Sequence, residues 1–177
     1  MKFFKPRPAK EVLSGRFRSA AEVFAMRKEG GVYVAEVRTS PERSVELFHE
    51  LTEHMPDIVD LALEDFRTGR NYRGEGLHLA EVTDTVARLK VPLAASGGLE
   101  LSVYTGEEQL CLGPMLDLWS YAKSDRWLYL LLGRGLEECV DLPPREWNVG
   151  LKEFSGAPEL VDAVSSTAER LTLKLVS

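Results

Sequence analysis

The residues whose types and spacing could most readily support catalysis or metal binding lie in His49–Pro56, HELTEHMP. This segment holds two of the three histidines of the chain, with glutamates between them. Histidine and glutamate at helical spacing bind zinc in metal-dependent hydrolases, where the two histidines of H-E-x-x-H lie four residues apart. His49 and His54 lie five residues apart, a step that turns about 140° around a helix. The two imidazoles therefore diverge, and we expect no metal site. A hydrolase that uses His49, Glu50 and His54 is the weakest of three functional hypotheses.

A second group of interest is rich in arginine and includes Gly69–Gly76, GRNYRGEG. It is not a nucleotide-binding P-loop, because Glu75 stands where that motif needs lysine. The planar guanidinium group of arginine does bind phosphate or carboxylate, and tyrosine can stack on a base or a ring. We therefore predict a loop that binds an anionic small ligand or RNA, unless its arginines pair with neighbouring acids in solvent. The candidate ligand-binding residues are Arg67, Arg70, Tyr72 and Arg73.

A third feature is a set of glutamates that recurs along residues 39–56. In a helix these glutamates share one side, and Leu47, Phe48, Leu51 and Met55 share the other, which predicts an amphipathic helix. An acidic face of this kind suits a basic protein partner, because complementary charge steers and orients association. The candidate protein-binding residues are Glu42, Glu46, Glu50 and Glu53.

The cysteines and aromatic residues give weaker signals. Cys111 and Cys139 are far apart and close to no histidine in the sequence, so they predict neither a disulfide framework nor an activated nucleophile. Aromatic residues concentrate in the C-terminal half, where they serve either core and rim packing or a binding surface. We assign no catalytic residue and no cofactor. The aromatic residues concerned are Trp119, Tyr121, Trp127, Tyr129 and Trp147.

The composition is that of a globular protein, with 177 residues, 44% hydrophobic and 28% charged. The net charge of −6 argues against a nucleic-acid binder, because such proteins are usually basic over the contact face. The sequence lacks the run of about 20 apolar residues that a membrane span requires. The start, MKFFKPRPAK, lacks the apolar stretch of a signal peptide. We expect a cytoplasmic protein that does not engage a membrane.

The elements that would position the candidate residues follow from hydrophobic periodicity. Residues 21–39 predict a β-hairpin that turns at Gly30–Gly31, and residues 39–56 predict a helix capped by Ser40 or Thr39 and stopped by Pro56. Residues 57–66 alternate as a half-exposed strand. Further expected elements are a helix over Leu77–Lys90 ended by Pro92, a meander over 99–122, a helix over 158–170 and a strand over 171–177. Residues 126–133 fit either a helix or a strand.

Together these elements predict an α+β fold with a mostly antiparallel sheet and helices packed mainly on one face. Residues 1–18 carry six lysines and arginines against one glutamate, and two prolines there disfavour a helix or a central strand. We expect residues 1–15 to form a basic N-terminal arm or tail and residues 16–177 to form a single α+β domain.

The leading functional hypothesis is a non-enzymatic protein-interaction or regulatory module that presents its acidic helix face to a basic protein partner. The alternative is a domain that binds an anionic small ligand or RNA through the Arg67–Arg73 loop. The third is the metal-dependent hydrolase. The open edges of a small antiparallel sheet are also compatible with a homodimer.

Overall fold

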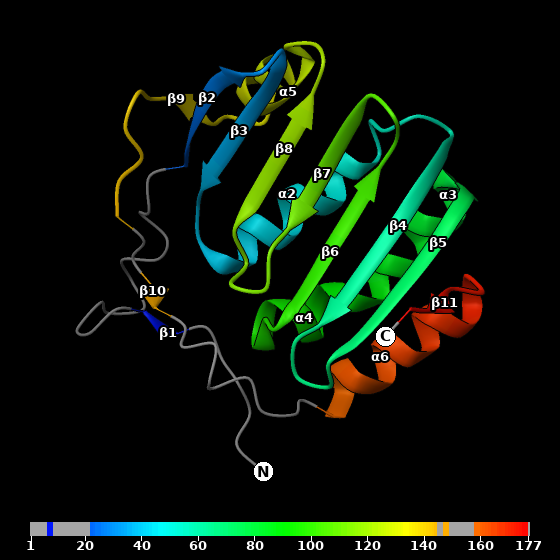
Figure 1. Ribbon diagram of the computed structural model, residues 1–177. Helices are drawn as coiled ribbons and strands as arrows, with labels where there is room; N and C mark the ends of the chain where they lie inside the picture. The colour runs from blue at the N-terminus through cyan, green and yellow to red at the C-terminus, as the bar shows by residue number, and fades with distance from the viewer. Residues whose placement is uncertain (1–6, 9–21, 145–146, 149–157, 177) are drawn as a thin grey trace.

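The computed structural model describes residues 7–8, 22–144, 147–148 and 158–176 (Figure 1). Nine strands form one open sheet in the order β11-β5-β4-β6-β7-β8-β3-β2-β9, and all neighbours in it are antiparallel except β2 and β9. The prediction of an α+β fold with a mostly antiparallel sheet is therefore confirmed. Of the expected N-terminal arm, residues 1–15, only β1 is described, and it pairs with β10 outside the main sheet.

The main strands are β2 (Val23–Glu29), β3 (Val32–Arg38), β4 (Ile58–Asp65), β5 (Arg70–His78), β6 (Leu99–Tyr104), β7 (Glu108–Leu112) and β8 (Leu118–Ala122). The two-residue strands are β1 (Arg7–Pro8), β9 (Glu137–Glu138), β10 (Trp147–Asn148) and β11 (Lys174–Leu175). The helices are α2 (Pro41–Thr52), α3 (Leu79–Val86), α4 (Lys90–Ser96), α5 (Arg126–Gly133) and α6 (Pro158–Arg170), with a 3₁₀ turn, η1 (Ala87–Leu89), between α3 and α4.

The predicted hairpin turn at Gly30–Gly31 and the predicted helix cap at Ser40 are confirmed. Gly30 and Gly31 adopt φ values of 57° and 88°, which a tight turn between right-twisted strands requires and glycine adopts without steric cost. The side chain of Ser40 accepts a hydrogen bond from the backbone N–H of Arg43 at 3.2 Å. This bond caps α2 by satisfying one of the donors that the first turn leaves open.

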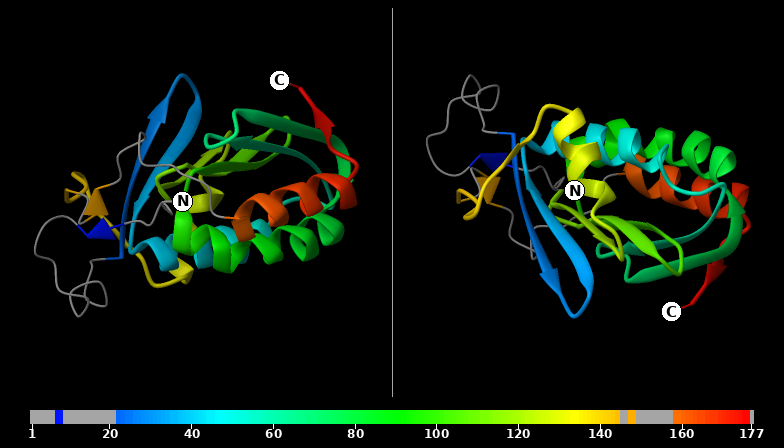
Figure 2. Two further views of the ribbon diagram at one scale, coloured as in Figure 1. Left: turned by 90° about the horizontal axis from the view of Figure 1, so that it is seen from below. Right: turned by 90° about the horizontal axis from the view of Figure 1, so that it is seen from above.

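The helices lie together on one side of the sheet, and the β2–β3 hairpin projects on the other side (Figure 2). Side chains alternate between the faces of each strand, so one row of apolar residues crosses six strands beneath the helices. Burial of each of these side chains stabilises the fold by roughly 1.5–3 kcal/mol. The row, all of it buried, is Leu63, Leu101, Leu112, Leu118, Val37 and Phe24.

Several sequence predictions need correction. The segment 69–76 is not a loop, because most of it belongs to β5, which pairs with β4 and shifts register between Val59 and Leu61. Two of its glycines have local structural reasons: a Cβ at Gly74 would lie 2.5 Å from the side chain of Leu173, and Gly76 has a φ of 64°. The N–H of Gly76 also donates to the Asp60 carboxylate at 2.9 Å. Glycine here indicates an irregular strand rather than a ligand-binding loop.

The helix predicted at Leu77–Lys90 begins at Leu79 and is shorter, because η1 interrupts it before α4. Pro92 does not end a helix but lies in the first turn of α4, where a missing N–H breaks no intrahelical bond. Residues 126–133, which fitted either state, form α5. The strand predicted over 171–177 contracts to the two residues of β11.

Candidate functional site

The two histidines of HELTEHMP lie in different surroundings. His49, in α2, is largely buried, and its Nε2 has no hydrogen-bond partner among the described residues. Burial, reinforced by the positive charge of Lys90, lowers the pKa of His49 to about 4. His54 lies exposed beyond the end of α2, with its Nε2 2.9 Å from Nη2 of Arg134. Over the described ranges, no three His, Cys, Asp or Glu side chains gather in a way that could hold a metal ion.

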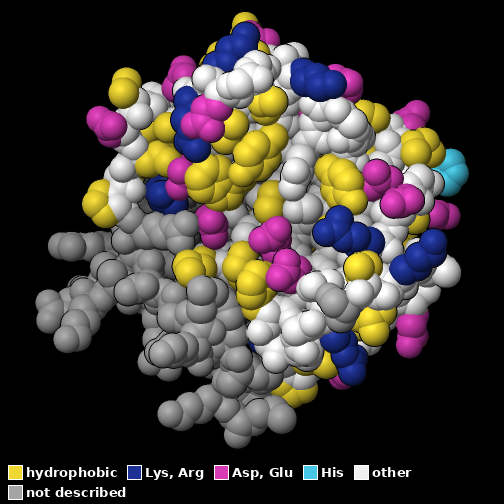
Figure 3. All heavy atoms as spheres, in the orientation of Figure 1, with side chains coloured by type: hydrophobic (Ala, Val, Ile, Leu, Met, Phe, Trp, Pro, Cys, Tyr) yellow, Lys and Arg dark blue, Asp and Glu magenta, His cyan; other side chains and the backbone are white. Residues whose placement is uncertain are grey.

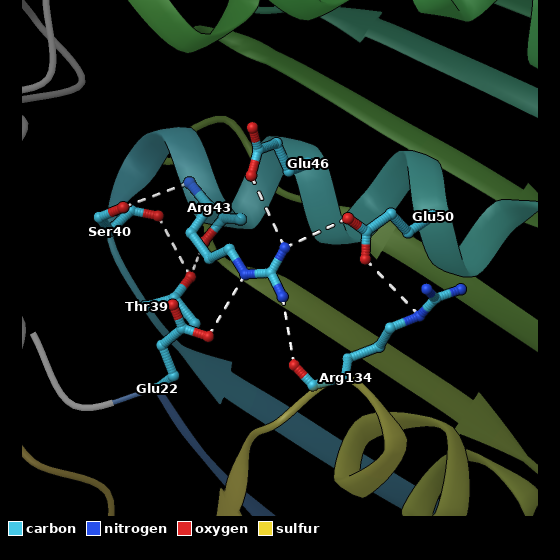
Figure 4. Close-up of polar contacts among 8 residues, drawn as sticks. Glu22, Thr39, Ser40, Arg43, Glu46, Glu50 and Arg134 are labelled. Atoms are coloured by element: carbon cyan, nitrogen blue, oxygen red, sulfur yellow. Dashed lines mark hydrogen bonds and ion pairs between the residues drawn. The ribbon is translucent and has the colours of Figure 1, made fainter. Parts of the chain in front are cut away.

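The acidic face of α2 meets arginines of the same chain (Figure 4). Nη1 of Arg43 lies 3.2 Å from a carboxylate oxygen of Glu50 and 3.6 Å from one of Glu46. Nε of Arg43 pairs with Glu22 at 3.3 Å, and Nη2 donates to the backbone oxygen of Arg134 at 3.2 Å. One guanidinium therefore joins the chain before β2, the helix α2 and the segment after α5.

Arg134 supplies a second cation to the same surface. Its Nε lies 3.6 Å from the Glu50 carboxylate, and its guanidinium also meets His54. Glu46 and Glu50 are thus paired within the chain, whereas Glu42 and Glu53 are exposed and form no ion pair in the part of the chain that the structure describes. Glu42, Glu46 and Glu50 lie in α2 and Glu53 is its C-cap residue, but Glu46 and Glu50 fasten α2 to its neighbours.

Arg67 forms a buried ion pair with Asp65. Its Nε lies 2.8 Å from Oδ1 of Asp65, and the two side chains are 1% and 2% exposed. The other carboxylate oxygen of Asp65 accepts a hydrogen bond from the hydroxyl of Thr68 at 3.0 Å, and the backbone N–H of Arg67 donates to Oδ1. These bonds close the turn between β4 and β5, so Arg67 stabilises a hairpin and is not presented to solvent.

The other three residues predicted to bind an anion point in different directions. Tyr72 packs against the hydrophobic core, opposite Leu63 on β4. Arg73 is the next residue along the strand, so it faces the opposite side of the sheet. Arg70, at the start of β5, is exposed. The structure therefore does not bring Arg67, Arg70, Tyr72 and Arg73 to one site.

The face of the sheet away from the helices carries aromatic side chains. Trp119 and Tyr121 alternate along β8 with the core residues Leu118 and Ser120, and Tyr104 ends β6 on the same side. Figure 3 views this face and shows hydrophobic side chains over β3 and β8, with acidic and basic side chains over β6, β4 and β5. We call it the open face. Gln109 on β7 also lies on the open face, because it pairs with Tyr104 on β6 and with Tyr121 on β8.

Contacts on the open face orient the indole of Trp119. Its Nε1 donates to Oδ2 of Asp117 at 2.9 Å, and the guanidinium of Arg27 lies 5.8 Å from the ring centroid. Between Ser102 and Trp119 the register places Cys111. Burial raises the pKa of Cys111 to about 12, so the thiol stays protonated near neutral pH and is a poor nucleophile. The face is suited to packing and hydrogen bonding.

Two carboxylates also meet on the open face. Glu64 of β4 lies directly opposite Glu100 of β6. Burial raises the pKa of Glu100, and the negative charges of Glu64 and Asp117 raise it further. Nothing in the sequence alone singles out this pair. Alternation places both glutamates on polar strand faces, but only the register between β4 and β6 places them opposite each other.

A shallow pocket of about 580 Å³ lies where α2 ends and α3 begins. Glu53, Asp57 and His78 contribute polar groups to its wall, and Ile58 and Leu79 contribute apolar ones. Glu53, Asp57 and His78 are exposed, so the pocket does not desolvate the groups that could recognise a ligand.

Compared with known protein families, with curated proteins and with solved structures, the chain matches none of them. Among the helices that the structure describes, none is long and apolar enough to cross a membrane.

Proposed function

We propose that the protein is a non-enzymatic binding module whose open face engages a protein partner. The observation that carries this proposal is the group Tyr104, Trp119 and Tyr121 on a sheet face that no described helix covers. Tyrosine and tryptophan are enriched at protein interfaces, where they bury a large area at a low cost in side-chain entropy. A sheet face that only meets water is usually polar.

The open face fits this role better than the acidic face of α2. Glu46 and Glu50 already pair with Arg43 and Arg134, and a basic partner would have to compete with these arginines. The aromatic residues of the open face are covered by no helix in the described part of the chain, so a partner would not have to displace one. We therefore still propose an interaction module, but its proposed binding surface is the open face of the sheet and not the acidic face of α2.

The anion-binding and hydrolase alternatives have less support. Arg67 is held by Asp65 inside the β4–β5 turn, so a phosphate would meet at most the exposed arginines Arg70 and Arg73, which are separated by the pleat of β5. Catalysis would need a base or nucleophile that is available near neutral pH. Neither the buried imidazole of His49 nor the thiol of Cys111 offers one to a substrate.

The proposal is tested by photo-crosslinking in cells of the native host. A benzophenone amino acid replaces Tyr121 on the open face in one variant and Tyr129 in a matched control. Tyr129 is 64% exposed on α5, in the helical layer. We expect a discrete crosslinked protein from position 121 and none, or a different pattern, from position 129. The same adducts from both positions, or none from position 121, would overturn the proposal.

A further inference from the structure

Glu64 and Glu100 on the open face identify the chemistry of the partner, an inference that rests on the proposed function. They are directly opposite each other on β4 and β6, a position where Cβ atoms lie about 5 Å apart and like charges destabilise a sheet. An antiparallel sheet ordinarily places an opposite charge or a neutral residue there. A local arrangement that costs stability is typical of a surface kept for binding.

The described chain supplies no cation to this pair. Neither carboxylate forms an ion pair among the described residues. Two arginines of the open face are engaged elsewhere, since Arg27 pairs with Glu29 and Arg38 pairs with Glu36. Arg73 and Lys174 share the face but lie one and two strands beyond Glu64. Neither reaches it within ion-pair distance.

A third carboxylate, that of Asp117, lies near Glu100 on the open face, and its negative charge also raises the pKa of Glu100. Gly113 directly follows β7, one residue beyond the pair of Leu101 and Leu112, and a glycine contributes no side chain there. A Cβ at Gly113 would lie 2.9 Å from a carboxylate oxygen of Asp117, so that third carboxylate leans over the glycine. Ser102 and Cys111, in the next row, are small and buried.

We infer that the open face binds a basic segment of a protein partner, with a lysine or arginine placed against Glu64 and Glu100 and apolar neighbours packed on Trp119 and Tyr121. The cation would relieve the repulsion between the two carboxylates, and the aromatic rings of β8, two strands from β6, would bury the apolar neighbours of that basic residue. Nucleic acid does not fit, because its phosphates would meet the carboxylates. Complementary charge at Glu64 and Glu100 and the aromatic rings on β8 of the same face thus define one class of occupant.

The test is an NMR titration that follows the indole N–H signals of Trp119 and Trp127. Trp127 is buried beneath the other face of the sheet and serves as an internal reference. The probe is a short peptide that alternates lysine with leucine, and its control has glutamate in place of lysine. We expect the lysine peptide to shift the signal of Trp119 and not that of Trp127. In the Glu64→Gln/Glu100→Gln variant, binding should weaken by about tenfold.

A charge-matched control removes the same number of carboxylates from α2 and its C-cap, as Glu42→Gln/Glu53→Gln, and should bind the lysine peptide like the wild type. Equal binding by the two glutamate-to-glutamine variants, loss of binding in the α2 variant, or equal shifts with both peptides would overturn the inference.

The crosslinking experiment separates the inference from the proposed function. No shift of Trp119 with either peptide, together with a discrete adduct from position 121, would overturn the basic partner and leave the binding face in place. No shift and no adduct would remove both. Thermal melting of each variant verifies that it is folded before its binding is compared with the wild type.

Discussion

Glu64 and Glu100 face each other across β4 and β6, on the side of the sheet away from the helices. One row further along the same strands, Leu63 faces Leu101 beneath the helices. The pairing that builds the core thus also builds the carboxylate pair, because alternation sends neighbouring residues to opposite faces. The core cannot change its register to relieve the repulsion, so the carboxylate pair is fixed by the packing behind it.

Replacing Glu100 with glutamine should stabilise the free protein at neutral pH. Because the pKa of Glu100 is raised in the fold, the charged form is penalised, and stability is lost as the pH rises through that pKa. Glutamine removes the penalty, which we expect to be at most about 1 kcal/mol, or roughly 2–4 °C in Tm for a chain of this size. The gain should shrink in high salt and vanish at acidic pH. A lower Tm for Glu100→Gln would mean that the two carboxylates are not in conflict.

Replacing Arg43 with alanine should destabilise the protein, because one guanidinium bridges Glu22, Glu50 and the backbone of Arg134. The expected loss is about 1–3 kcal/mol in urea unfolding, the range for hydrogen bonds to charged groups. Arg43→Lys should restore little of it, since an ammonium cannot reach several partners as a planar fork does. Arg88→Ala, at an exposed position, is the matched control. A loss no larger than that of Arg88→Ala would show that the contacts are screened by solvent.

Local sequence signals predicted much of this fold. The glycine pair at Gly30–Gly31, the cap at Ser40 and the alternation of Val59, Leu61 and Leu63 each depend on neighbouring residues, and each is confirmed. The errors arose where distant parts of the chain decide the outcome. The arginine-rich segment 69–76 was predicted to be a loop, but pairing with β4 makes most of it a strand.

The sites were harder to predict than the fold for the same physical reason. Glu46 and Glu50 were correctly placed on a helix, but Arg134, which neutralises Glu50, lies far along the sequence. The distance between Glu64 and Glu100 is set by a strand pairing that spans α3 and α4. Periodicity tells which face a side chain occupies, and only the register of the sheet tells what lies opposite to it.

The buried pair of Asp65 and Arg67 should respond unequally to the removal of each partner. Asp65→Ala leaves a guanidinium that is 1% exposed without its counter-ion, and Nη1 and Nη2 of Arg67 already lack acceptors in the part of the chain that the structure describes. We expect a loss of about 3–5 kcal/mol in urea unfolding. Arg67→Met should cost less, because Asp65 keeps the hydroxyl of Thr68 as a donor and the volume is preserved. Equal losses would contradict this account of the β4–β5 turn.

The same pair restricts how the anion-binding hypothesis can be tested. Replacing Arg67 along with Arg70 and Arg73 would combine a folding defect with a binding defect, because Arg67 holds the turn. Arg70→Ala/Arg73→Ala removes only exposed cations and should leave the free energy of unfolding within about 0.5 kcal/mol of the wild type. A binding assay with inorganic phosphate on this variant isolates the hypothesis. We expect no difference from the wild type.

His49 should make the protein sensitive to acid. Its pKa falls from 6.5 to about 4 in the fold because burial, aided by Lys90, disfavours the imidazolium. Above pH 6.5 the imidazole is neutral in both states and has no effect on stability. As the pH falls below 6.5, the unfolded chain binds a proton that the folded chain does not, so stability is lost progressively until the pH reaches about 4. The loss contributed by His49 should be on the order of 2 kcal/mol at pH 5.

Urea unfolding of the wild type and of His49→Gln, compared at pH 7 and at pH 5, measures this contribution. Glutamine cannot take up the proton, so the stability of His49→Gln should fall less between the two pH values even if the variant is weaker at pH 7. His78→Gln, at an exposed histidine, is the matched control for the loss of an imidazole. If His49→Gln and the wild type lose the same free energy between pH 7 and pH 5, the acid sensitivity has another origin, and Nε2 of His49 is not held away from water as its burial in α2 implies.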